Sequence, residues 1–228
     1  FRKQKCYPGL DLSSGGDLTS LALVFPYMMN GEKHYFVYAH SFIPKNRVQE
    51  HINTDHVPYD LWIREGLVEV TETMGGIKTD YKYILAHLKK LIKEYELDVQ
   101  WLCYDPHNAS AFLADLEALG IDSVAVQQSA RSLNDATVYF LLEIKPGHVH
   151  HHGNGMLKWS LANAKTVSNS FGEIKIDKEY KIDRIDVVDA IIDAWTEAMK
   201  GEVKPNANEL LQLWLQQNEK YTKRAGRR

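Results

Sequence analysis

The order of strand-like and helical segments constrains the fold of this 228-residue chain more than any other feature. Three segments rich in aliphatic and aromatic residues come first, over 7–12, 18–25 and 34–42, and Gly, Pro and Asn separate them. Strands joined by such short turns predict an antiparallel meander. Further along, the strand "VQWLCYD", a helix over 107–119 and the strand "SVAVQQ" predict a parallel βαβ unit. Together these segments predict an α/β fold with a mixed central sheet, flanked by helices on both sides.

Helical periodicity is clearest in "TDYKYILAHLKKLIKEYE", behind Thr79 as the expected cap. Its apolar residues at helical spacing are Ile84, Leu85, Leu88, Leu91, Ile92 and Tyr95. A helix over 135–144, a short helical piece up to Trp159 and a hairpin turning at Gly172 are also expected. A final helix over 187–199 carries an apolar face of Val188, Ile191, Ile192 and Trp195.

Composition predicts one domain over 1–200, followed over 201–228 by a linker, a short amphipathic helix and a basic tail. The net charge is −3, but residues 200–228 hold seven basic and three acidic side chains, which leaves −7 for the body. No apolar run has the length of a membrane span, and two cysteines without metal-type spacing suggest no disulfide framework. We therefore expect a soluble, intracellular protein without a membrane partner.

Carboxylates stand at three places where structure alone does not require them. Asp11 lies between Leu10 and Leu12 in the first strand, Asp105 ends "VQWLCYD", and an acidic cluster begins the final helix. That cluster consists of Asp183, Asp186 and Asp189. If the first strand pairs with the strand of the βαβ unit, Asp11 and Asp105 meet at the centre of the sheet. A helix packed across the sheet then brings the third set of acids to the same place.

Such a group of like charges is costly unless cations occupy it, because neighbouring carboxylates repel and raise one another's pKa. Carboxylate oxygens suit Mg²⁺ or Mn²⁺. Two such ions would activate a water and stabilise the departing 3′-oxygen of a phosphodiester. The pattern thus predicts two-metal phosphodiester hydrolysis.

Each acid also has a purely structural interpretation. Asp105 precedes Pro106 and can start a turn or cap the following helix, and acids at a helix start interact favourably with its dipole. Asp17, after a double glycine, is interpreted as a turn or cap residue. Asp11 has the weakest structural explanation, because apolar residues flank it within a strand.

Four segments together resemble the nuclease domain of phage terminase large subunits, over roughly residues 7–200. These segments are "GLDLSSGGDLTSLALV", "YDPHNASAFLADLEALGI", "MLKWSLANAKTV" and "KIDRIDVVDAIIDAW". The resemblance implies an RNase H-like, resolvase-type fold and an endonuclease that cuts concatemeric double-stranded viral DNA during packaging. It also implies that Asp11, Asp105 and Asp186 are catalytic metal ligands. Whether Asp189 or Asp183 joins them stays open. Asn163 and Lys178 match polar positions near the family's site and are expected to position substrate.

By the same resemblance, the partners are a packaging ATPase domain, a small terminase subunit and a portal protein, in the cytoplasm of the infected host. No G-x-x-x-x-G-K-[ST] loop occurs in the sequence, so no ATPase activity is expected of this chain.

Two other functions are compatible with the sequence. Another RNase H-like nuclease, such as a junction resolvase or a transposase, would share the acids. Alternatively, the chain is a docking module without catalysis, with the basic tail contacting a portal or capsid protein or packing on the body. The segment "HVHHHGNG" suggests a zinc site less well than a solvated or DNA-facing loop, because three imidazoles on one short segment make a poor cage without further ligands.

Overall fold

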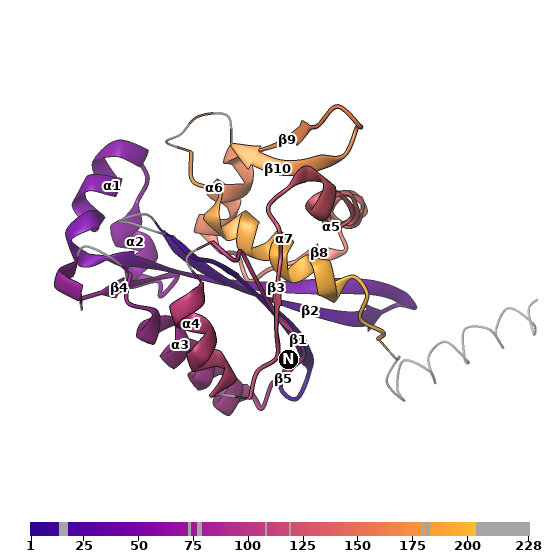
Figure 1. The fold of residues 1–228 in the computed structure, drawn as a ribbon, viewed down its shortest axis with the longest axis horizontal. Coiled ribbons are helices and arrows are strands. Elements are labelled where there is room, and N and C mark those ends of the chain that lie inside the picture. The colour runs from indigo at the N-terminus through magenta and orange to yellow at the C-terminus, as the bar shows by residue number, and fades with distance from the viewer. Residues whose placement is uncertain are drawn as a thin grey trace, which may run out of the picture.

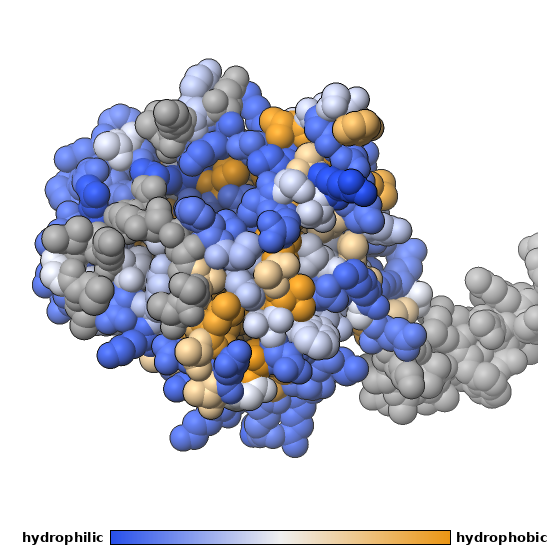
Figure 2. Space-filling view, viewed as in Figure 1, coloured by the Kyte–Doolittle hydropathy of each residue, from blue (hydrophilic) through white to orange (hydrophobic). Residues whose placement is uncertain are grey.

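The computed structural model describes residues 1–13, 18–72, 74–76, 79–107, 109–118, 120–178, 180 and 183–203. Asp17 and most of the predicted C-terminal tail lie outside these residues. No helix of the described chain is long and apolar enough to cross a membrane. On the face that Figure 2 shows, the surface is mostly hydrophilic.

A mixed central sheet organises the molecule, with the strand order β4-β3-β2-β1-β6-β7 (Figure 1). The first three strands are β1 (Lys5–Asp11), β2 (Thr19–Met29) and β3 (Glu32–Pro44), and they pair antiparallel as predicted. The predicted βαβ unit consists of β6 (Leu102–Tyr104), α4 (Ser110–Glu117) and β7 (Ser123–Ala125), with parallel pairing. β6 also pairs parallel with β1, which places the unit beside the meander.

Further short strands extend this sheet. β4 (Val68–Thr71) and β8 (Val149–His150) both pair parallel with β3, at opposite ends of it, and β5 (Asp98–Val99) pairs with β1. A separate hairpin is formed by β9 (Ala164–Ser168) and β10 (Ile174–Lys178), and Gly172 in its turn has a φ of +79°. Glycine tolerates this left-handed conformation, as expected for the predicted turn.

Helices cover both faces of the sheet (Figure 1). On one face, α3 (Tyr81–Tyr95) and α4 pack over a core that includes Leu10, Leu21 and Phe42. On the other face lie α5 (Ala130–Ile144), α6 (Gly155–Asn163) and α7 (Asp186–Ala198), around a core that includes Trp195. Two α-helices were not predicted from the sequence: α1 (Val48–Asp55) and α2 (Tyr59–Arg64). They follow β3 and the short 3-10 helix η1 (Lys45–Arg47). A second 3-10 helix, η2 (Met74–Gly76), follows β4.

Two helix starts differ from the predictions. α3 begins after Asp80 rather than Thr79, because the Asp80 side chain accepts the amide N–H of Lys82 at 2.9 Å. α5 begins five residues before the predicted Asp135, where the Ser129 hydroxyl accepts the amide N–H of Ser132. In both cases a side-chain oxygen satisfies an otherwise unpaired backbone donor and defines the end of the helix.

The long helix α7 crosses the sheet in close contact with β1. A Cβ atom built on Gly9 would overlap the carbonyl oxygen of Ala190 and lie 2.6 Å from the amide nitrogen of Ala194. A glycine on the strand and alanines on the helix therefore allow the two backbones to approach one another. At the other end of the helix, the Lys33 ammonium donates to the carbonyl oxygens of Met199 and Gly201 at 3.0 and 2.8 Å. Both contacts define where α7 lies on the sheet.

Candidate metal centre

Strand alternation directs the first two acids toward α7. In β1, Leu10 and Leu12 enter the core beneath α3 and α4, so Asp11, between them, faces the opposite side. In β6, Tyr104 enters the same core as Leu10, and Asp105 follows it at the end of the strand. Because Leu10 pairs with Tyr104 in parallel register, Asp11 and Asp105 occupy neighbouring positions at the carboxyl ends of the two strands.

Helix α7 supplies the other carboxylates of the site. Asp186 is its first residue, Asp189 lies in its first turn, and Asp193 follows one turn later. Spacings of three and four residues place these side chains along one face of a helix. The contact of the same helix with Gly9 brings that face to the end of β1 that carries Asp11. The predicted convergence of Asp11, Asp105, Asp186 and Asp189 is thus present in the structure, in what we call the acidic cluster, with Asp193 added.

Electrostatic coupling shows how close these carboxylates lie. Burial raises the pKa of Asp11 well above its usual value, and the charges of Asp186, Asp189, Asp193 and Asp105 raise it further. Burial, followed by the charge of Asp186, raises the pKa of Asp189 to about 8. An ion-free cluster therefore retains protons at neutral pH, which is the behaviour of carboxylates gathered to bind cations.

Asp193 was missed in the sequence, although its position four residues after Asp189 indicates the same helix face. Its side chain is buried, with Oδ1 accepting a hydrogen bond from Gln128 Nε2 at 2.9 Å, and Oδ2 has no hydrogen-bond partner among the described residues. Burial raises its pKa well above the usual value, and the Gln128 hydrogen bond opposes this shift. Asp193 thus lies deeper than the other acids, and burial disfavours its charged form.

The other predicted site residues have varied surroundings. Asp105 Oδ1 accepts the backbone N–H of His107 at 2.9 Å, so its predicted turn role uses one of its carboxylate oxygens. Asp183 Oδ2 accepts the backbone N–H of Tyr180 at 3.0 Å, within a turn before α7. The charge of Asp183 is not among those that raise the pKa of Asp11 or of Asp189.

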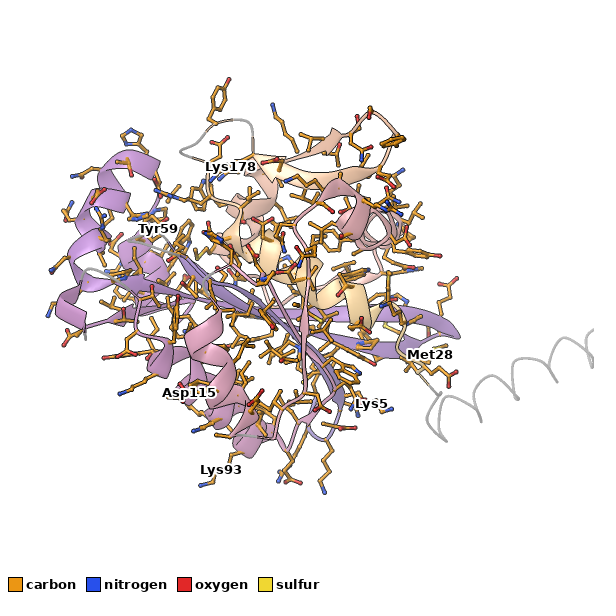
Figure 3. All side chains as sticks on the ribbon, in the orientation of Figure 1. Lys5, Met28, Tyr59, Lys93, Asp115 and Lys178 are labelled. Atoms are coloured by element: carbon orange, nitrogen blue, oxygen red, sulfur yellow. The ribbon has the colours of Figure 1, made fainter. Side chains whose placement is uncertain are left out.

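Asn163 and Lys178 separate into different roles. The Asn163 amide donates to the carbonyl oxygen of Arg184 at 3.1 Å, two residues before α7, so it holds the segment that leads to Asp186. Lys178 is exposed at the end of β10, and Figure 3 shows it on the side of the hairpin. Its charge lowers the pKa of Asp189, as does that of Lys175, whereas Asp177 raises it. The hairpin thus adds both signs of charge beside the acids, which the sequence analysis did not indicate for Lys175 and Asp177.

A second buried carboxylate supports the same segment. The Asp55 side chain, at the end of α1, is inaccessible to solvent and accepts hydrogen bonds from Tyr59 Oη at 2.8 Å and Arg184 Nε at 3.3 Å. Burial alone would raise its pKa, but hydrogen bonds from His51, Thr54 and Tyr59 and the Arg184 charge bring it to about 2. Asp55 is therefore ionised and anchors Arg184 next to the start of α7. Nothing in the local sequence of α1 indicated this role.

The donor set of the acidic cluster fits a hard divalent cation. All of its side-chain donors are carboxylate oxygens, which Mg²⁺ and Mn²⁺ prefer. The pKa values of Asp11 and Asp189 are raised first by burial and then by the charges of neighbouring carboxylates, and a bound cation would offset that repulsion.

The chain is similar to proteins of known structure and sequence. It is 29% identical over 188 residues to the terminase large subunit of Enterobacteria phage HK97, covering 80% of this chain and 35% of that protein. It is 28% identical over 209 residues to protein YmfN of Escherichia coli K12, covering 89% of this chain and 45% of that protein. The chain thus spans less than half the length of these relatives.

Solved structures give the same fold. The HK97 large terminase crystal structure has a TM-score of 0.74 at 28% identity, over 85% of this chain and 39% of that one. The large terminase nuclease from thermophilic phage G20c with bound magnesium has a TM-score of 0.52 at 12% identity, over 88% and 82%. The first of these structures is a large terminase and the second a large terminase nuclease, and the fold of this chain is RNase H-like, as its resemblance to the family implied. The family profile "Terminase large subunit, endonuclease domain" matches residues 1–202, and the chain belongs to that family.

Proposed function

We propose that this chain is a divalent-metal-dependent endonuclease that cuts concatemeric double-stranded viral DNA during phage genome packaging. The observation that carries the proposal is the gathering of Asp11, Asp105, Asp186 and Asp189 from two strands and one helix, in a member of the terminase endonuclease family. Gathering these carboxylates destabilises the fold unless bound cations offset their mutual repulsion.

In this proposal Asp11, Asp105 and Asp186 hold Mg²⁺ or Mn²⁺, with Asp189 as a further ligand. Two bound ions would lower the pKa of an attacking water and stabilise the departing 3′-oxygen. Support comes from the carboxylate donor set and from related nuclease structures of phage G20c, which carry bound magnesium in one case and bound cobalt in another. Asp193 would lie behind these ligands and keep Gln128 in place through its hydrogen bond.

Other residues of the chain bind and orient the substrate in this scheme. Lys175 and Lys178 would offer positive charge to the DNA backbone next to Asp189, because basic side chains provide most of the affinity for phosphate groups. Asn163 and Asp55 would act indirectly, since both hold Arg184 and thereby the start of α7. The acidic body predicts weak DNA binding by this chain alone.

The wider setting is proposed from the family. A packaging ATPase domain, a small terminase subunit and a portal protein would be its partners, in the cytoplasm of the infected bacterium. We also propose that residues 1–200 form the nuclease unit and that the basic tail serves docking. Truncation after Lys200 should then leave cleavage intact, and loss of cleavage would contradict a docking role.

Nicking of supercoiled plasmid is the decisive test. We expect cleavage with Mg²⁺ or Mn²⁺ and none with EDTA, and we expect Asp11→Asn, Asp105→Asn and Asp186→Asn each to abolish it. Asp115→Asn, at an exposed position on α4 (Figure 3), is the matched control and should cut like the original chain. If Asp11→Asn retains metal-dependent cutting, the assignment is wrong. If no variant or metal gives cutting, the non-catalytic docking function is favoured instead.

A further inference from the structure

The segment "HVHHHGNG" is not an isolated loop in the structure. His150 belongs to β8, which pairs with β3 through Tyr35 and Phe36. This pairing brings His148 and His150 next to Glu32 and His34 at the start of β3. The segment by itself lacks further ligands for a metal ion, and β3 supplies two possible ligands. We call Glu32, His34, His148 and His150 the histidine cluster.

From these contacts we propose that the histidine cluster binds one divalent transition-metal ion, of which Zn²⁺ is the representative. Ligand atoms of Glu32, His34 and His148 all lie within 4.8 Å of one another. His148 Nε2 lies 3.5 Å from Glu32 Oε2, and His34 Nδ1 lies 2.9 Å from His150 Nε2. In a tetrahedral site with bonds of about 2.0–2.1 Å, ligand atoms are about 3.3 Å apart. Glu32, His34 and His148 would therefore supply three ligands to one ion, and His150, at hydrogen-bond distance from His34, supports the ring of His34.

A neighbouring carboxylate orients one of these imidazoles. Glu143, in the last turn of α5, lies 2.8 Å from His148 Nδ1. This contact holds the ring of His148 with its Nε2 atom toward Glu32 Oε2, at 3.5 Å. A carboxylate that accepts from the far nitrogen of a ligating histidine is a recurrent feature of zinc sites. The arrangement orients His148 before any ion arrives.

Access also favours an ion. The His34 side chain lies at the buried end of the cluster and is 6% exposed. The Glu32 side chain is 67% exposed, which gives an ion a route from solvent. Nitrogen-rich donors select zinc-like ions over Mg²⁺, so this site and the acidic cluster should take different metals.

A second group of possible ligands, His40, Glu69 and His87, is less suitable. The rings of His40 and His87 stack at 3.9 Å between centroids and 15° between planes, so their in-plane lone pairs run side by side. The rings of His34 and His148, the two imidazoles proposed as ligands, are inclined by 51°, which allows their lone pairs to converge on one ion. The rings of His34 and His150 stack at 25°, in keeping with a supporting role for His150 rather than that of a third imidazole ligand.

The histidine cluster is independent of the proposed nuclease site. Asp11 pairs with Ser20, and Ser20 pairs with Ser41 of β3, seven residues from His34. At about 3.3 Å per residue, the two sites are about 23 Å apart along the strand. A metal here would tie β3, β8 and the end of α5 together, and its loss should not stop cleavage.

Zinc titration by calorimetry, with excess Mg²⁺ present to occupy the acidic cluster, tests the proposal on the full chain. We expect one Zn²⁺ per chain, a higher melting temperature with Zn²⁺, and loss of both effects in His148→Ala. Glu143→Gln should weaken binding about 10–100-fold, because it removes only the orienting acceptor. Glu32→Gln, at an exposed position, should weaken binding without any risk to folding.

His87→Ala and Asp186→Asn are the matched controls, and both should bind Zn²⁺ like the original chain. The proposal is overturned if no Zn²⁺ binds, if binding survives in both His148→Ala and Glu32→Gln, or if His87→Ala or Asp186→Asn removes it. Should His148→Ala fail to fold, the Glu32→Gln and Glu143→Gln titrations decide the matter.

Discussion

Replacing Asp189 by asparagine should flatten the dependence of stability on pH between about 6.5 and 8. The pKa of Asp189 is about 8 in the folded, ion-free domain, against an ordinary value of 3.8. The folded state therefore holds a proton that the unfolded state has already lost. Stability falls with rising pH wherever the folded state binds more protons, so this group destabilises the fold increasingly up to pH 8.

The size of the effect follows from linkage. One proton held only by the folded state changes the free energy of unfolding by up to about 1.4 kcal/mol per pH unit. Integration from pH 6.5 to 8 with these two pKa values gives about 1.5 kcal/mol lost by the original chain through Asp189. Burial is the main cause that lowers the pKa values of His40 and His87 to about 3 and 4 in the folded state, from an ordinary value of 6.5. Both imidazoles therefore gain protons on unfolding near pH 6.5, but they do so equally in the original chain and in Asp189→Asn, so this contribution cancels in the comparison.

Urea unfolding followed by tryptophan fluorescence, in EDTA, measures this directly. We expect the free energy of unfolding of the original chain to fall more steeply from pH 6.5 to 8 than that of Asp189→Asn, by about 1.5 kcal/mol. Asp115→Asn should keep the original slope. Equal slopes for the original chain and Asp189→Asn would refute the assignment of a shared, proton-retaining cluster. Addition of Mg²⁺ should stabilise the original chain more at pH 8 than at pH 6.5, because the ion replaces the retained protons.

Three other substitutions test how the site is built. Gly9→Ala should lower the free energy of unfolding by about 1–3 kcal/mol and abolish cleavage, because its Cβ would displace α7. Gly66→Ala is the control: its φ of +71° should cost stability, but a Cβ there meets no atom within 4 Å, so the variant should still cut. Asp193→Asn should raise the melting temperature at pH 8 and keep cleavage, because a neutral amide avoids the cost of a buried carboxylate, and a lower melting temperature would contradict this. Arg184→Ala should lower the free energy of unfolding by about 3 kcal/mol, because it leaves the buried Asp55 without the Arg184 charge. In urea unfolding, the double variant with Asp55→Asn should recover part of that loss. Strictly additive losses would exclude the pairing.

Much of the sheet was predictable because its residue pattern is local. The meander, the βαβ unit and the neighbouring positions of Asp11 and Asp105 follow from strand periodicity and turn residues, and the structure confirms them. The helix 187–199 carried its own apolar stripe, and this determined which face of α7 meets the sheet.

What the sequence did not reveal depends on contacts between distant segments. α1 has weak periodicity, so neither the helix nor the buried Asp55 at its end stood out, and its partner Arg184 lies 129 residues away. The hydrogen bond from the Asn163 amide to the Arg184 carbonyl oxygen joins segments that are 21 residues apart, and the sequence alone did not indicate it. The histidines of "HVHHHGNG" were expected to lie in a loop, because nothing in that segment shows that β3 pairs with it.

The close contact between Gly9 and α7 makes three carboxylates of the acidic cluster move as one body. Asp186, Asp189 and Asp193 lie on the same helix, and the close backbone contact of Gly9 with Ala190 and Ala194 restricts sliding of that helix along β1. A displacement of one helical turn, about 5.4 Å, would carry all three away from Asp11 at once. The position of this one helix therefore decides whether the acidic cluster is assembled or dispersed.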